Sequence, residues 1–107
     1  MVFTAGIIGW DEHEQFPATD FVGQARQVFH NTLAVLAEAS AGPEHIVRMT
    51  WYVTSRDEYV DAVRDVGTAY REIIGRHYPA MAVVEVTRLV EPAAKLEVET
   101  TAVVPEE

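Results

Sequence analysis

Cysteine is absent from the sequence. This absence excludes disulfide bonds, thiolate nucleophiles and cysteine-based zinc sites. Long apolar runs are also missing, so no segment is suited to span a membrane, and the chain does not open with a basic, apolar-cored secretory leader. We therefore expect a cytoplasmic protein that makes no use of thiol chemistry.

Basic residues are scarce as well. Eight Lys and Arg residues stand against 17 Asp and Glu residues, which gives a formal net charge of −9. The few cations are scattered along the chain rather than gathered into a patch. Because such a charge balance repels a phosphate backbone, the sequence argues against nucleic acid and anionic membranes as partners.

The remaining composition is that of an ordinary globular domain. Hydrophobic residues make up 49% and charged residues 23% of the 107 residues, a balance typical of folded chains and unlike disordered ones. A chain of this length has room for one hydrophobic core. We expect a single domain over residues 1–107.

The spacing of apolar residues predicts six secondary-structure elements. Four strands are expected at residues 2–9, 45–54, 80–90 and 95–104. Two helices are expected from a cap at Thr19 or Asp20 to about Ser40, and from the capping signature at Ser55 to Gly75. The order is β-α-β-α-β-β, in which both helices can cover one face of a mixed sheet. This arrangement is an α+β sandwich of two layers.

The same spacing predicts the core. The first helix, the second strand and the second helix each carry apolar side chains at the steps that place them on one side. The residues concerned are Val22, Ala25, Phe29, Leu33, Leu36, Val47, Met49, Trp51, Val53, Tyr59, Val63, Val66, Tyr70 and Ile73. We expect them to lie between the helices and the sheet.

The sheet face away from the helices has a mixed character. Its expected members are Tyr52, Val84, Val86, Glu97 and Glu99. A partly apolar surface of this kind usually marks an interface. Association with a partner is therefore the first functional inference.

Four stretches of the chain point to one family. They are QARQVFHNTLAVLAEASAG, HIVRMTWYVTSRDEY, YPAMAVVEVTRL and KLEVETTAVV, at residues 24–42, 45–59, 78–89 and 95–104. In this order they resemble the RidA/YjgF family, also called L-PSP endoribonucleases. The resemblance implies a chorismate-mutase-like fold, a homotrimer whose sheets line a central barrel, and small-molecule clefts between subunits. It also implies hydrolysis of reactive enamines and imines, such as 2-aminoacrylate, to keto acids and ammonia, with no metal or organic cofactor.

The sequence departs from this family after Pro79-Ala80. Deaminating members carry an arginine there that binds the substrate carboxylate, whereas this chain carries Met81. A thioether has neither the charge nor the bidentate donors that match a carboxylate. Losing such a charge-assisted pair costs about 1.5–3 kcal/mol of binding. The resemblance therefore implies a hydrolase whose substrate is not the usual one.

Two further departures lie near the N-terminus. The family's Ser-Gly step is Ala5-Gly6 here, which removes a hydroxyl and keeps the glycine backbone. Family members also carry a preceding strand with a pocket tyrosine. Either the true start of the protein lies upstream of Met1 or, as we expect, this domain lacks that strand. Residues 2–8 would then form an unprotected sheet edge or change the trimer.

The candidate catalytic residue is Glu97. The resemblance aligns it with the cleft glutamate that positions the hydrolytic water, and a carboxylate beside the apolar Met81 would be partly desolvated, which favours general acid/base use. The candidate substrate-binding residues are Gly6, Met81 and Trp10, the last as a pocket wall at a strand end. The structural alternative makes Glu97 and Glu99 a solvated or barrel-lining pair and the large apolar side chains packing residues. The histidines lack the short spacing of metal ligands, so no metal site is expected.

Three functions are compatible with these observations. The first is a cofactor-free enamine or imine hydrolase (a deaminase) that depends on Glu97. The second is a non-catalytic trimeric protein that binds or senses a metabolite in the same cleft. The third is the endoribonuclease activity in the family name, against which the net charge argues.

Overall fold

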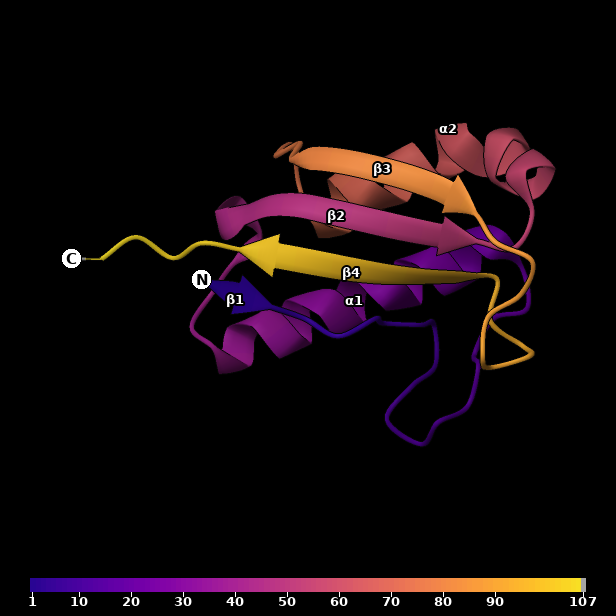
Figure 1. The fold of residues 1–107 in the computed structure, drawn as a ribbon, viewed down its shortest axis with the longest axis horizontal. Helices are drawn as coiled ribbons and strands as arrows, with labels where there is room; N and C mark the ends of the chain where they lie inside the picture. The colour runs from indigo at the N-terminus through magenta and orange to yellow at the C-terminus, as the bar shows by residue number, and fades with distance from the viewer. Residues whose placement is uncertain (107) are drawn as a thin grey trace.

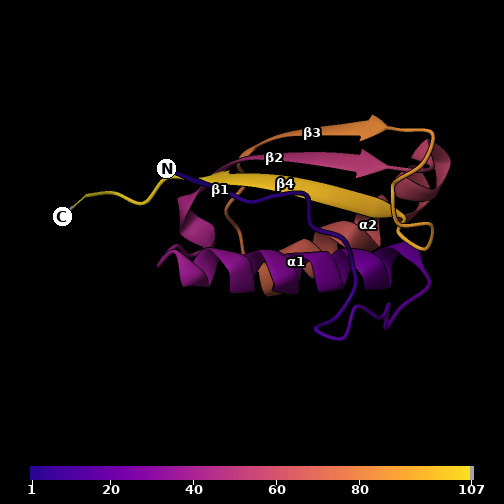
Figure 2. The same cartoon turned by 60° about the horizontal axis from the view of Figure 1, so that its bottom comes forward.

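Two helices lie side by side on one face of a four-stranded sheet (Figures 1 and 2). The computed structural model describes residues 1–106, so Glu107, the last residue of the predicted domain, lies outside the described residues. The elements are β1 (Val2–Phe3), α1 (Phe21–Glu38), a 3-10 turn (Pro43–His45), β2 (Ile46–Val53), α2 (Arg56–Ile73), β3 (Ala80–Glu85) and β4 (Leu96–Ala102).

The sheet is mixed, with strand order β1-β4-β2-β3. β2 and β3 are parallel, and α2 is the crossover that connects them, because parallel neighbours need a long connection. The contacts of β4 with β2 and with β1 are antiparallel. The predicted α+β sandwich of two layers is confirmed.

Side-chain caps begin both helices near the predicted positions. Asp20, one of the two caps considered, accepts a hydrogen bond from the Gly23 amide at 3.3 Å. Ser55 accepts one from the Glu58 amide at 3.1 Å. Each cap satisfies a backbone donor that the first helical turn leaves without a partner.

Most of the predicted core is buried, including Phe29, Leu36, Met49 and Trp51. Val47 was expected among them and is 46% exposed. The reason is a shift of strand register between Ile46 and Arg48, which turns Ile46 rather than Val47 toward the helices.

Val63 is the other wrong core prediction, since it is 47% exposed. The apolar stripe of α2 reaches beyond the part of the helix that the sheet covers. Val63 lies in a pocket between α2 and β3, next to Met81.

The first predicted strand, residues 2–9, is interrupted. β1 ends at Phe3, Thr4 still exchanges hydrogen bonds with Thr100, and the chain returns to β4 only at Ile7, which pairs with Val98. The backbone departs from the ladder at Ala5-Gly6. This departure creates the close approach described next.

Candidate functional site

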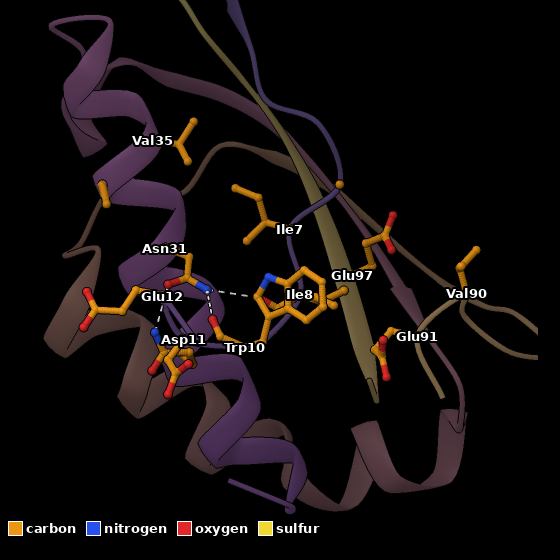
Figure 3. Close-up of a pocket in the computed structure, with 13 residues that line it drawn as sticks. Ile7, Ile8, Trp10, Asp11, Glu12, Asn31, Val35, Val90, Glu91 and Glu97 are labelled. Carbon is orange, nitrogen blue, oxygen red and sulfur yellow. Dashed lines mark hydrogen bonds between the residues drawn. The ribbon is translucent and has the colours of Figure 1, made fainter. Parts of the chain in front are cut away.

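The segment that follows β1 is held between β4 and α1. Ile7 and Val98 exchange two backbone hydrogen bonds of 2.9 Å. From α1, the Asn31 amide donates to the carbonyls of Ile8 at 3.1 Å and Trp10 at 2.8 Å (Figure 3). Gln27 donates to the Asn31 carbonyl oxygen at 2.8 Å, which fixes the orientation of that amide. The backbone of residues 7–10 is therefore clamped from both sides.

A groove of about 810 Å³ lies along this segment, and we call it the Glu97 groove. Its lining residues are Gly6, Ile7, Ile8, Trp10, Asp11, Glu12, Gln27, Asn31, Ala34, Val35, Val90, Glu91 and Glu97 (Figure 3). Three of the four predicted site residues, Gly6, Trp10 and Glu97, are thus brought together. Their roles in binding and catalysis stay predictions.

The Glu97 side chain lies over the backbone of Gly6. A Cβ at position 6 would collide with the Glu97 carboxylate and lie 2.6 Å from its Cδ atom. The carboxylate therefore lies directly against the exposed Gly6 backbone. This is the close backbone approach for which a strand glycine is suited.

The wall of the groove at Trp10 is supported by an ordered turn. The Trp10 ring contacts Phe16, with ring centroids 6.3 Å apart. Asp11 accepts hydrogen bonds from the amides of Gln15 at 3.0 Å and His13 at 2.8 Å. These two bonds, that of Gln15 first, lower the pKa of Asp11. The Asp11 carboxylate thus anchors the turn in its ionised form.

Gln24 positions the start of β4 and was missed by the sequence analysis. Its side chain is 1% exposed, donates to the Ala93 carbonyl at 2.9 Å and accepts from the Lys95 amide at 2.8 Å. These bonds tie the turn before β4 to α1, two residues ahead of Glu97. The available signal was a glutamine next to Ala25 on the buried side of an amphipathic helix, a position that requires a hydrogen-bond partner.

Tyr52 and Glu99 flank Glu97 on the open face of the sheet. In the strand register Tyr52 pairs with Glu97 and with Val84, while Thr50 pairs with Glu99. The Glu99 carboxylate, with a smaller contribution from Glu97, raises the pKa of the Tyr52 phenol. The phenol therefore stays protonated beside two carboxylates and can donate a hydrogen bond at neutral pH.

Met81 lies elsewhere. It pairs with Met49, whose side chain is buried under the helices, so Met81 points to the helix side of the sheet, whereas Glu97 points to the open side. The expected contact between Met81 and Glu97 is not formed within one chain. Met81 instead lines a second cavity of about 180 Å³ between α2 and β3, and we call it the Met81 pocket. Its other lining residues are Trp51, Tyr59, Val63, Val66, Gly67, Tyr70, Arg71, Tyr78 and Pro79.

Two histidines have structural partners. The His45 ring accepts from the Gly42 amide at 2.9 Å, and the His77 ring donates to the Ile46 carbonyl at 2.7 Å. Over residues 1–106, no three His, Asp or Glu side chains gather closely enough to hold a metal ion. In the same part of the chain, neither helix combines the length and apolar character needed to cross a membrane.

Comparison with known proteins gives consistent matches. The family model described as Endoribonuclease L-PSP matches residues 1–104. A RutC family protein from Pyrococcus abyssi is 32% identical over 89 residues, which cover 82% of this chain and 67% of that protein. The crystal structure of E. coli TdcF with bound serine is 29% identical with a TM-score of 0.81, over 96% of this chain and 80% of that one.

A Mycobacterium tuberculosis member of the YjgF/YER057c/UK114 family is 28% identical with a TM-score of 0.76, over 95% of this chain and 77% of that one. These matches agree with the two-layer fold and extend over nearly the whole domain. The chain belongs to the endoribonuclease L-PSP family, also known as the YjgF/RidA family.

Proposed function

We propose that this protein is a cofactor-independent hydrolase that deaminates a small enamine or imine in the Glu97 groove. The observation that carries the proposal is the Glu97 carboxylate, which lies against the exposed backbone of Gly6 in a groove walled by Trp10. A carboxylate in such a groove can act as a general base toward water. The family resemblance implies that Glu97 corresponds to the cleft glutamate of its members, which supports the same role.

The reaction needs only one proton-transferring group. Water attacks the imine carbon, and Glu97 takes a proton from that water as the new carbon–oxygen bond forms. Glu97 then returns the proton to the nitrogen, which gives a neutral carbinolamine. In a second transfer Glu97 takes the proton of the new hydroxyl group and passes it to the nitrogen as the carbon–nitrogen bond breaks, so that a carbonyl compound and ammonia leave. Imine and water are consumed, and the carboxylate is regenerated unchanged.

The groove's charge limits the substrate. Its lining includes the carboxylates of Asp11, Glu12, Glu91 and Glu97 but, among the described residues, neither a lysine nor an arginine. An anionic substrate such as 2-aminoacrylate would be repelled there. We propose that the substrate is a neutral or cationic imine without a carboxylate.

We propose that the active form is a homotrimer whose clefts lie between subunits. The open face of the sheet supports association, since Phe3 is 70% and Val84 is 42% exposed on the strands β1 and β3. Burial of such apolar area is the main driving force of most protein association. Neither nucleic acid nor a membrane is proposed as a partner, because the net charge of −9 opposes both. The cytoplasmic location stays a prediction.

The test uses benzaldimine, an imine without a carboxylate, as the substrate. The measured quantity is the rate of ammonia release, compared with the spontaneous rate without protein. We expect the wild-type protein to accelerate this release and Glu97→Gln to lose about 10²-fold or more of that rate. Glu99→Gln is the matched control, because Glu99 lies on the same strand face outside the groove, and it should keep most of the activity. Equal rates for wild type and Glu97→Gln would reject the proposed mechanism.

The second candidate is a trimeric protein that binds a metabolite without turning it over. The replacement of the family's arginine by Met81 favours it. This candidate predicts that a ligand raises the melting temperature while Glu97→Gln alters no rate. The variant Met81→Arg separates the two further in the proposed trimer, whose clefts lie between subunits. A gain of activity toward 2-aminoacrylate would show catalytic machinery adapted to another substrate.

A further inference from the structure

Arg71 places a cation beside the residue that replaces the family's arginine. It lies in the last turn of α2 and lines the Met81 pocket. Its one hydrogen bond is a long contact of 3.4 Å to the Thr68 hydroxyl. The Lys and Arg ion pairs found within residues 1–106 use Arg26, Arg56 and Lys95, so the Arg71 guanidinium is unpaired in this part of the chain.

The Arg71 guanidinium lies close to Gly67. A Cβ at Gly67 would meet only Arg71 Nη1, at 3.5 Å, so the guanidinium lies close to bare helix backbone one turn before its own Cα. Glycine inside a helix is less favourable than alanine. Because Gly67 has no side chain, the rim of the Met81 pocket stays open beside the Arg71 guanidinium.

The interior of the Met81 pocket suits an aromatic ring. Trp51, Tyr59, Tyr70 and Met81 line it with rings and a thioether. Its volume of about 180 Å³ is slightly larger than the roughly 150 Å³ engineered cavity that holds benzene. Thioethers also make favourable contacts with aromatic rings. One ring with a short substituent therefore matches the space.

We propose that the Met81 pocket binds a small arylalkyl carboxylate, with its ring inside the pocket and its carboxylate on Arg71. The guanidinium fork offers a carboxylate two parallel hydrogen bonds, and no carboxylate of the described chain occupies it. The anion-binding group thus comes from α2 instead of the start of β3. The proposal does not rest on the hydrolase activity, because the residues that line the pocket belong to one chain and do not include Glu97.

The alternative role for Arg71 is purely structural. A cation in the last turn of a helix, such as Arg71 in α2, interacts favourably with the helix dipole. Arg71 would then contribute to stability but not to ligand affinity. The experiment must therefore measure binding at the pocket itself.

The two tryptophans provide this measurement, because Trp51 lines the Met81 pocket and Trp10 lines the Glu97 groove. In ¹H–¹⁵N spectra of the full-length protein, titrated with 3-phenylpropionate, the Trp51 indole signal should shift saturably while the Trp10 signal stays in place. The variant Trp10→Phe identifies the two signals. The neutral 3-phenylpropanol should bind wild type at least about tenfold more weakly, which tests the charge without any substitution.

Arg71→Gln should weaken 3-phenylpropionate binding about tenfold or more, and Arg71→Lys should weaken it less. Arg64→Gln is the control, since Arg64 is an exposed residue of the same helix that does not line the pocket. Glu97→Gln should leave the binding unchanged, so loss of hydrolysis and loss of binding are read separately. The proposal is overturned if the alcohol binds as tightly as the acid, if Arg71→Gln retains wild-type affinity, or if only the Trp10 signal moves.

Discussion

The Glu97 groove and the Met81 pocket lie toward opposite edges of one sheet and differ in how they are built. The groove adjoins β4 and α1. The Asn31 amide holds the backbone carbonyls of Ile8 and Trp10 along it, and the Gln24 amide holds the turn before β4. The pocket adjoins β3 and α2 and is formed by aromatic rings packed edge-on or stacked, such as Tyr70 on Tyr78 at 5.8 Å. Hydrogen bonds fix positions in the first, whereas packing shapes the second.

Their charges differ in the same way. Four carboxylates line the groove, whereas the pocket carries the single cation of Arg71. Polar groups at fixed positions favour catalysis, because the reacting atoms must be held at defined distances and angles. An apolar cavity with one charge at its rim favours recognition of a ligand with one charged end. The fold therefore offers two sites with different requirements.

The same substitution, glycine to alanine, should have opposite effects in the two regions, and the larger effect is expected at Gly9 beside the groove. A Cβ there would lie 2.8 Å from the Gln24 carbonyl oxygen and 3.0 Å from its Cα. Both contacts are with helix backbone, which cannot move aside as a side chain can. We expect Gly9→Ala to lower the free energy of unfolding by about 1–3 kcal/mol in urea denaturation. Unchanged stability would mean that the segment over α1 is not tightly clamped.

At the pocket, Gly67→Ala should stabilise the protein. The added methyl meets only the end of the Arg71 side chain, at an ordinary contact distance. Because alanine is the better helix former, we expect a gain of about 0.5–1 kcal/mol in the same denaturation experiment. A loss of stability would show that Arg71 needs the open space at Gly67.

The last effect is confined to alkaline pH and concerns Tyr70 in the wall of the pocket. Burial, aided by the neighbouring Tyr78, raises the pKa of Tyr70 from 10.0 to about 12. A raised pKa means that the neutral phenol is favoured in the folded state. Its contribution to stability is therefore complete below pH 10 and is lost as the pH rises from 10 toward 12. In urea denaturation between pH 10 and pH 12, the free energy of unfolding of Tyr70→Phe should fall less steeply than that of the wild type. Tyr52→Phe alters the open face of the sheet and leaves the Tyr70 contribution in place, so its free energy of unfolding should fall as steeply as that of the wild type.

Local signals predicted the fold well. The caps at Asp20 and Ser55 and the buried stripe containing Phe29 and Leu36 each depend on residues three or four positions apart. Interactions over such short separations form in the same way wherever the segment lies. The alternation in β2 predicted Trp51 in the core but failed at Val47, because the register shift depends on the neighbouring strand β4.

The candidate site was predicted only in part. Glu97, Gly6 and Trp10 came from a family pattern and a strand end, and the structure places them in one groove. The amides of Gln24 and Asn31 were missed, since the first bonds a carbonyl 69 residues away and the second a carbonyl 23 residues away. Nothing in the residues near Gln24 identifies a partner at that distance along the chain.

The element types, the acidic character and the absence of thiol chemistry follow from the sequence alone, because they depend on composition and on short-range spacing. Which side chains meet depends on the folded arrangement of the elements. The pairing of β2 with β3 and β4 turns Met81 to the helix side and Glu97 to the open side, and a shift of one residue would have reversed either of them. The packing of α2 on this sheet then places Arg71 beside Met81. Register and helix placement are long-range properties, set by the burial of the whole core rather than by any one segment.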